Sequence, residues 1–579
     1  MIFRDLNLDK KDILYLLIIF IFASLVCVNS IYHYIHLNVK SDVLVYLVNG
    51  LFYSGLNDNI QSTSSMFLSP VICYLTGLVF RIWYVNRVAI FVVTGAFCVL
   101  GTLGMYVFLK IRFNRFLSLF GSVLFASFSL LLSNWSNGAI DVPAIAVSIW
   151  TIIFLILAVD KNPKYYILTS VLLVVSIFTR YTAFFLIPLI LLYYLSKHDF
   201  FDNLNLLLTN SNKFTQKFKT YIKSREFKYI VISIVLAAVL FAGACILITQ
   251  QGSGLTFITQ TSDSVSGFQG SKYSSNYGYT SDDAYYVINF MHMLYFDKLP
   301  VLFVDFSHIL MFLLLVSLAI HIIGFARDFD EAKKLIENRK RYPIRHFDKL
   351  LLIAILVLAA VMILGFYKNN NILSNVALLT IIVISFSLLK KLDIESRYYR
   401  LNLFCIGWFL VYFIFFSLIN IKTPRYMIAI VPPLIYFIVL AVESILISFT
   451  NGKRPFEFKS KNSHRIAKIL IIAAIAFLMV HAVTYEVKDK NAENDNKKLN
   501  KLFDFLVDYD PDYADKNITS DHTYSARYGT WHIKKDVIRN ITLFEGTPTE
   551  DYIVTNHTVE LDNYNQIYKS GKIRLYERI

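Results

Sequence analysis

Long apolar segments are the feature of this sequence that most limits how it can fold. About 20 predominantly apolar residues are needed to span the hydrocarbon core of a bilayer. Thirteen segments approach or reach that length: 12–35, 88–109, 116–133, 142–159, 164–179, 181–196, 229–249, 301–324, 349–366, 372–389, 402–420, 426–448 and 466–484. They predict a mainly α-helical, polytopic membrane protein with about 13 transmembrane helices.

The distribution of Lys and Arg predicts how these helices are oriented. If the N-terminus is cytoplasmic and the spans alternate, about 33 of the 56 basic residues fall in cytoplasmic connections, against about 9 in outer loops and 14 in the C-terminal tail. Basic residues concentrate on the cytoplasmic side of membrane proteins. We therefore expect a multi-pass protein of the cell membrane with an extracytoplasmic C-terminus. This distribution accounts for the net charge of +15 without a nucleic-acid partner.

The sequence divides into a membrane part, 1–484, and an extracytoplasmic tail, 485–579. The membrane part has two large outer segments: 36–87, whose apolar stretch interrupted by Pro70 predicts an interfacial helix, and 250–300, which is rich in Tyr, Ser and Gly. Helical and β-rich stretches alternate in the tail, which predicts a small α/β domain. The predicted elements are helices 495–508 and 524–532 and strands 517–520, 536–544, 551–555 and 573–577.

Charged residues of both signs come together at the outer ends of the predicted spans. They are Asp42, Asp141, Arg180, Lys422 and Arg425. Charges beside membrane spans are costly and mark functional sites by default. A carboxylate can take a proton from a hydroxyl group, and cations can hold a phosphate group and stabilise it as it leaves. A membrane enzyme that uses a lipid-phosphate donor needs both kinds of group at this depth.

Each of these residues also has a purely structural interpretation. The two aspartates could be helix caps, Asp42 for a helix over 43–53 and Asp141 for one with Pro143 in its first turn. The arginines could extend to lipid headgroups. Tyr426 could be an interfacial residue, because tyrosine is common where a membrane meets water.

Short motifs along the chain resemble those of a known enzyme family. The first outer segment has Ser41-Asp42-Val43, then Ser69-Pro70 and Asn86-Arg87. Asp141-Val142-Pro143, Thr179-Arg180-Tyr181 and Pro424-Arg425-Tyr426 follow in order. This arrangement is similar to that of the GT-C glycosyltransferases of the protein O-mannosyltransferase and aminoarabinose-transferase group (families 39 and 83), including archaeal members that use dolichyl-phosphate sugars. Val43 and Leu68-Ser69-Pro70 depart from the Asp-Glu and Lys-Pro-Pro common in that group.

The resemblance implies a role for each candidate residue. Asp42 takes the place of the catalytic carboxylate, and Asp141 that of a second carboxylate beside it. Arg180, Arg425 and Lys422 are the candidates for binding the donor phosphate, and Tyr46, Tyr181 and Tyr426 for lining the substrate pocket. The family implies inversion at the sugar carbon without a required cofactor. No Cys/His cluster suggests a metal site, although a divalent metal stays open.

The function expected from the sequence is therefore that of an integral membrane glycosyltransferase. It would move a sugar from a polyprenyl (dolichyl) monophosphate to a hydroxyl group on a protein, lipid-linked glycan or surface polymer. Its partners would be the bilayer, the lipid-linked donor and the acceptor. A transporter or flippase of lipid-linked sugars is one alternative, although the middles of the spans carry few charges. A non-catalytic surface assembly protein that binds partners through its tail is another.

Overall fold

A computed structural model describes most of the chain. The described residues are 5–60, 69–250, 284–290, 346–391, 397–419, 422–451, 461–486 and 493–579, apart from 7, 38, 58, 199, 369, 541, 546, 547 and 560–562, with 309, 313 and 315 in addition. The predicted span 301–324 and most of the outer segment 250–300 lie outside the described residues.

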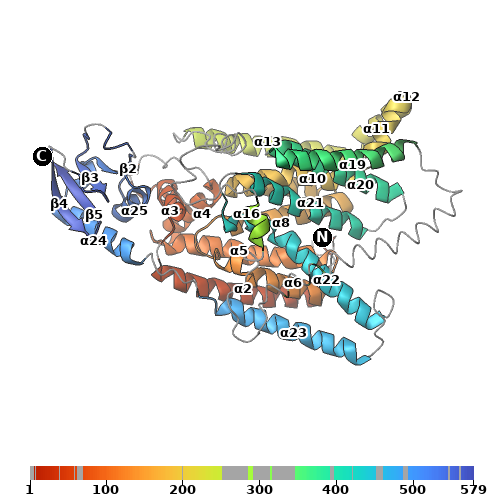
Figure 1. Cartoon of the computed structure of the whole chain (residues 1–579), viewed down its shortest axis with the longest axis horizontal. Helices are drawn as coiled ribbons and strands as arrows, with labels where there is room; N and C mark the ends of the chain where they lie inside the picture. Colours follow the sequence, from red (N-terminus) through yellow and green to blue (C-terminus); the bar gives the residue numbers. More distant parts are fainter. Residues whose placement is uncertain are drawn as a thin grey trace.

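Apolar helices run side by side along the long axis of the molecule (Figure 1). They are α2 (Lys10–His36), α5 (Val88–Lys110), α6 (Arg115–Ser127), α7 (Ser129–Leu132), α8 (Asp141–Asp160), α9 (Tyr165–Thr179), η1 (Tyr181–Phe185), α10 (Leu186–Lys197), α13 (Arg225–Gln250), α19 (His346–Tyr367), α20 (Asn371–Lys391), α21 (Arg397–Leu418), η2 (Pro424–Ile430), α22 (Val431–Asn451) and α23 (Lys461–Val483). Among the described residues, seven helices are long and apolar enough to cross a membrane. The mainly α membrane fold is confirmed, whereas the number of 13 spans stays a prediction.

The predicted cytoplasmic connections gather at one end of the helical bundle. Arg400 of α21 pairs with Asp160 of α8, with 2.9 Å between Nη2 and Oδ1. Arg115 of α6 lies 3.3 Å from Oδ1 of Asp12 in α2. The polar helices α11 (Phe200–Thr209) and α12 (Ser211–Ile222) project at this end, far from the strands (Figure 1). The helix ends that the alternating orientation of the spans assigns to the cytoplasmic side therefore lie together in the structure.

Two short helices, α3 (Ser41–Ser54) and α4 (Pro70–Ile82), cross closely at the opposite end. Pro70 begins α4, where the missing N–H is not needed. The crossing depends on glycine, because a Cβ atom added at Gly77 would lie 2.6 Å from the carbonyl oxygen of Gly50. Close backbone approach of this kind lets α4 hold α3 beside the ends of the long helices.

The tail folds as α24 (Glu493–Tyr509), η3 (Tyr513–Asp515), β1 (Ile518–Ser520), α25 (Thr523–Ile533), β2 (Val537–Arg539), β3 (Tyr552–Thr555), β4 (Tyr564–Ser570) and β5 (Ile573–Arg578). The sheet has the order β2-β1-β3-β5-β4. Strand β1 is parallel to β2 and β3, and β5 is antiparallel to β3 and β4. The predicted strand 536–544 is shorter than expected, and β4 was not predicted. Buried residues of this sheet and of α24 and α25 form one apolar cluster with those of α3 and α4.

Candidate active site

Asp42 lies in the first turn of α3 and pairs with Arg425. Its Oδ2 atom is 3.1 Å from Nη1 and 3.2 Å from Nη2 of the arginine, which belongs to η2. The N-cap of α3 is Lys40, and no side chain caps the helix. The alternative that Asp42 is a cap is therefore wrong. A carboxylate in the first turn is also favoured by the helix dipole.

Asp141 and Arg180 form a second pair, deeper in the protein. Asp141 is the first residue of α8, Arg180 follows the last residue of α9, and Nη1 of the arginine donates to Oδ1 of the aspartate. The exposed fractions of the side chains are 4% and 15%. Asp141 makes no side-chain capping hydrogen bond, which contradicts its structural alternative. Among the described residues, its second oxygen, Oδ2, is buried without a hydrogen-bond partner.

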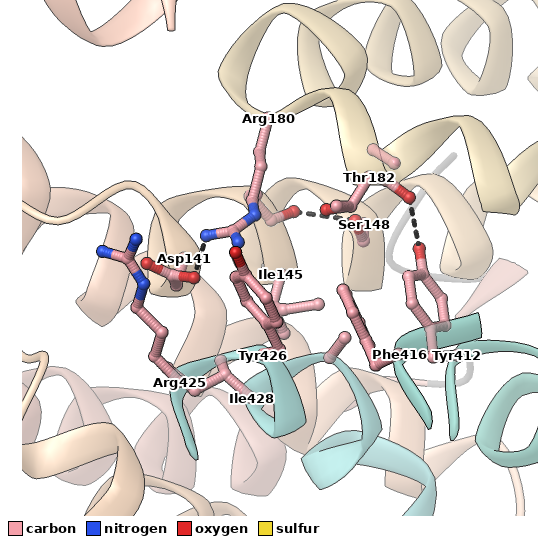
Figure 2. Close-up of a pocket in the computed structure, with 13 residues that line it drawn as sticks. Asp141, Ile145, Ser148, Arg180, Thr182, Tyr412, Phe416, Arg425, Tyr426 and Ile428 are labelled. Atoms are coloured by element: carbon pink, nitrogen blue, oxygen red, sulfur yellow. Dashed lines mark hydrogen bonds and ion pairs between the residues drawn. The ribbon is translucent and has the colours of Figure 1, made fainter. Parts of the chain in front are cut away.

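Tyr426 joins the two pairs. The guanidinium carbons of Arg180 and Arg425 lie 5.3 Å and 5.9 Å from the centre of its ring. The ring also stacks on Phe416, with 4.9 Å between centroids. Figure 2 shows Asp141 between the two guanidinium groups, with Tyr426 beside them. Cations over an aromatic face are stabilised by the ring quadrupole, so Tyr426 helps to hold two positive charges in one place.

A small cavity of about 20 Å³ opens beside these groups (Figure 2). It is lined by Asp141, Ala144, Ile145, Ser148, Arg180, Thr182, Ala183, Tyr412, Phe416, Arg425, Tyr426, Ile428 and Ala429. Its wall therefore combines one carboxylate and two guanidinium groups with apolar and aromatic side chains. A cavity of this size holds about one water molecule, so it marks where charged groups converge and is too small to hold a sugar.

The other predicted site residues lie in different places. Tyr46 of α3 is 3% exposed, and burial raises the pKa of its phenol, so the group stays an O–H donor. Lys422 is 3% exposed and lies three residues before Arg425. Tyr181 packs in a cluster with Phe178 and Ile248 and is not among the residues that line the cavity. Asp42, Tyr46 and Lys422 are likewise not among the residues that line this cavity, and the pocket roles that the resemblance implied for Tyr46 and Tyr181 stay predictions.

Sequence reasoning missed two residues that shape the site. Tyr286 of the short helix α16 (Tyr285–Ile288) donates from its hydroxyl to the carbonyl of Thr423 and accepts from its N–H, at 3.0 Å and 3.1 Å. It thereby fixes the backbone that enters η2. Arg527, in the tail, lies 3.7 Å from Oδ1 of Asp42. The Tyr-rich composition of 273–286 was a signal for Tyr286, whereas nothing near Arg527 in the sequence links it to Asp42.

Comparisons with known proteins bear on the family and the fold. A family model described as dolichyl-phosphate-mannose-protein mannosyltransferase matches residues 68–206, which include Asp141 and Arg180. The fold is similar to that of ArnT from Cupriavidus metallidurans bound to undecaprenyl phosphate, with a TM-score of 0.51 and 8% identity over 96% of this chain and 97% of that one. The family model covers residues 68–206 only, and the likeness to ArnT shows that the two proteins share a fold. No curated protein sequence matches this chain.

The fold accounts for the position of the site. Asp141 is the first residue of one helix and Arg180 follows the last residue of another, so the charges lie at helix ends and not in the middle of the apolar segments. The mainly α-helical, multi-pass membrane architecture expected from the sequence is confirmed, and the fold is like that of ArnT. An archaeal origin and the cytoplasmic location of the N-terminus stay predictions.

Proposed function

We propose that this protein transfers a single sugar from a polyprenyl monophosphate, such as dolichyl or undecaprenyl phosphate, to a hydroxyl group on a protein, lipid-linked glycan or surface polymer. The observation that carries the proposal is the meeting of two carboxylate–guanidinium pairs around Tyr426, at the ends of apolar helices. A donor of this kind places its phosphate where its hydrocarbon chain leaves the bilayer. The likeness to ArnT, whose structure holds undecaprenyl phosphate, supports the choice of donor class.

The negatively and the positively charged groups have different roles in the reaction. Asp42, one third exposed, takes the proton of the acceptor hydroxyl as the acceptor oxygen forms its bond to the anomeric carbon. The bond from that carbon to the phosphate oxygen breaks, and its electron pair leaves with the phosphate. Arg180 and Arg425, with Lys422 nearby in the chain, stabilise the charge that develops there. Attack opposite to the leaving phosphate inverts the configuration of the sugar.

The second carboxylate has a different part in this scheme. Asp141 is almost fully buried and holds Arg180, so it fixes the direction of a phosphate-binding group. Its Oδ2 atom, which has no hydrogen-bond partner among the described residues, can accept from a hydroxyl of the donor or acceptor. Tyr426 keeps both guanidinium groups close, which lowers the cost of bringing two cations together before the phosphate arrives.

Asp42→Asn tests the proposal. We expect membranes with this variant to transfer label from a radiolabelled polyprenyl-phosphate sugar at a rate lower by on the order of 10²-fold or more. Asp508→Asn is the matched control, because Asp508 is an exposed carboxylate of α24, and should behave as the wild type. Full activity of Asp42→Asn at normal expression would remove Asp42 from the chemistry. A wild-type protein that moves lipid-linked sugar across proteoliposomes without transferring it would favour the flippase alternative.

Metal independence is a further part of the proposal. The groups named above supply proton transfer and charge stabilisation by themselves, so we expect no cofactor to be required. Transfer should persist in EDTA. Loss of activity in EDTA and its recovery with a divalent cation would show that the leaving phosphate needs a metal ion as well.

A further inference from the structure

In the part of the chain that the structure describes, the C-terminal domain reaches the candidate catalytic carboxylate through the side chain of Arg527. Nη1 of Arg527, in α25, donates a hydrogen bond of 2.8 Å to Oγ of Ser41 and lies 3.7 Å from Oδ1 of Asp42. Its side chain is 19% exposed. Burying a guanidinium is costly unless it meets an acceptor or an opposite charge, and here it meets both in the first turn of α3.

Arg527 belongs to a stripe of α25 that faces the first outer segment. The hydroxyl of Tyr524 lies 3.2 Å from the carbonyl oxygen of Val39 and 2.7 Å from Oδ1 of Asn496 in α24. Trp531 stacks on Phe80 of α4, with 6.1 Å between centroids, and the carbonyl of Lys534 accepts from Asn57. Positions 524, 527 and 531 recur at helical spacing and therefore share one face, and Lys534 is the residue that follows the helix.

An adjoining face of α25 packs against the rest of the tail. Nε2 of His532 lies 2.7 Å from Oδ1 of Asp504 in α24, and Tyr528 donates to Oδ1 of Asn500 in the same helix. A Cβ atom added at Gly529 would lie 2.3 Å from Phe503. Helix α25 is thus clamped between α24 and the pair α3–α4. The packing of the folded domain therefore fixes the position of Arg527.

The two oxygens of Asp42 face different partners. Oδ2 receives both Nη groups of Arg425, whereas Oδ1 faces Nη1 of Arg527 at a distance longer than a hydrogen bond. Oδ1 therefore keeps a lone pair for an acceptor proton while the carboxylate is held from both sides. Orientation of a reacting group within a fraction of an ångström changes rates strongly.

We propose that Arg527 is a positioning residue, through which the C-terminal domain holds the first turn of α3 and directs Oδ1 of Asp42 toward the acceptor. This inference rests on the proposed function, because it assigns the orientation of the base in that reaction. It also makes residues 493–579 a part of the active site. An enzyme lacking them would lose the partner of Ser41 and one of the two cations that flank Asp42.

Three variants test the proposal. Arg527→Gln should lower kcat by about 10- to 10²-fold, while KM for the lipid donor changes by less than about 3-fold. Both contacts described above use the single atom Nη1, so an ammonium group can make them, and Arg527→Lys should recover activity to within about 5-fold of wild type. Ser41→Ala removes only the hydrogen-bond acceptor and should give a partial loss of kcat. Arg539→Gln, an exposed arginine of β2, is the matched control.

Several results would overturn the inference. One is a wild-type kcat in Arg527→Gln. Another is a raised KM with unchanged kcat in that variant, which would make Arg527 a donor-binding cation. The third is an Arg527→Lys variant no more active than Arg527→Gln. If Arg527→Gln fails to fold, the kcat of Ser41→Ala tests the inference instead, and a wild-type kcat in that variant would overturn it.

Hydrogen–deuterium exchange separates this inference from the proposed function. Amides of residues 39–46 should exchange faster in Arg527→Gln than in wild type, whether or not the protein transfers sugar. Wild-type protein inactive with every polyprenyl-phosphate sugar would refute the function alone. An active wild type whose exchange and kcat are both unchanged by Arg527→Gln would refute the positioning role alone.

Discussion

The buried pair of Asp141 and Arg180 shows how single residues determine both stability and binding at this site. Removing one partner leaves a charge without compensation in a place that water hardly reaches. We expect Arg180→Met to lower the free energy of unfolding by about 3–5 kcal/mol, because breaking a buried pair is strongly destabilising. Asp141→Asn in the same chain should recover part of this loss. Unfolding of the single and double variants in detergent measures both effects, and strictly additive losses would contradict the coupling.

Lys534 gives the C-terminal domain a predicted dependence on pH. Burial lowers the pKa of its ammonium group from 10.5 to about 8, and Nζ lies 3.5 Å from the centre of the Trp531 ring. Between these values the unfolded chain binds more protons than the folded one, so the free energy of unfolding should rise with pH from about 8 to 10.5. Lys534→Met should flatten this rise, as unfolding curves across the range would show. An equal rise in the variant would assign it to another group.

The sequence could predict the site only in part. Asp42, Asp141, Arg180 and Arg425 were identifiable because charges at the ends of apolar segments are rare and must be compensated. The order of these residues in the sequence did not show that Asp42 pairs with Arg425 and Asp141 with Arg180. Arg527 was beyond prediction, because its contact with Asp42 joins residues 485 positions apart through the packing of a domain that sequence reasoning treated as separate.

At the scale of elements, apolar helices were predictable and short polar strands were not. A run of apolar residues of spanning length has few other ways to fold. Strand β4 has the sequence Tyr-Asn-Gln-Ile-Tyr-Lys-Ser and lies at the edge of the sheet, with its middle mostly outside the core. An edge strand with little to bury carries a weak apolar signal, which explains why it was missed.

The crossing of α3 and α4 is an element-scale property that can be tested directly. A Cβ atom at Gly77 would force the two helices apart, because its nearest neighbour is backbone. Gly77→Ala should therefore cost about 1–3 kcal/mol of unfolding free energy and lower transfer activity, since α3 carries Asp42. Gly243→Ala in α13 is the control, because nothing lies within 4 Å of the added atom. It should be neutral or slightly stabilising. Equal effects of both variants would show that the crossing tolerates separation.

At the scale of the whole molecule, the fold is shared with a protein of 8% identity. Charged residues are costly inside a bilayer, which accounts for their clustering at both ends of the bundle. Ion pairs such as Arg400–Asp160 close one end, and the candidate active site and the C-terminal domain occupy the other.

Which end faces the cytoplasm is the last prediction, and it rests on the excess of basic residues in one set of connections. Cysteine substitutions at two exposed positions test it: Lys219 in α12 and Asp508 in α24 lie at opposite ends of the molecule. A membrane-impermeant maleimide added to intact cells should label Asp508→Cys and leave Lys219→Cys unlabelled until the cells are broken. The five native cysteines are buried or partly buried, so the parent chain provides the blank. Labelling of position 219 alone would place the candidate active site on the cytoplasmic side, where an acceptor carried outside the cell could not reach it.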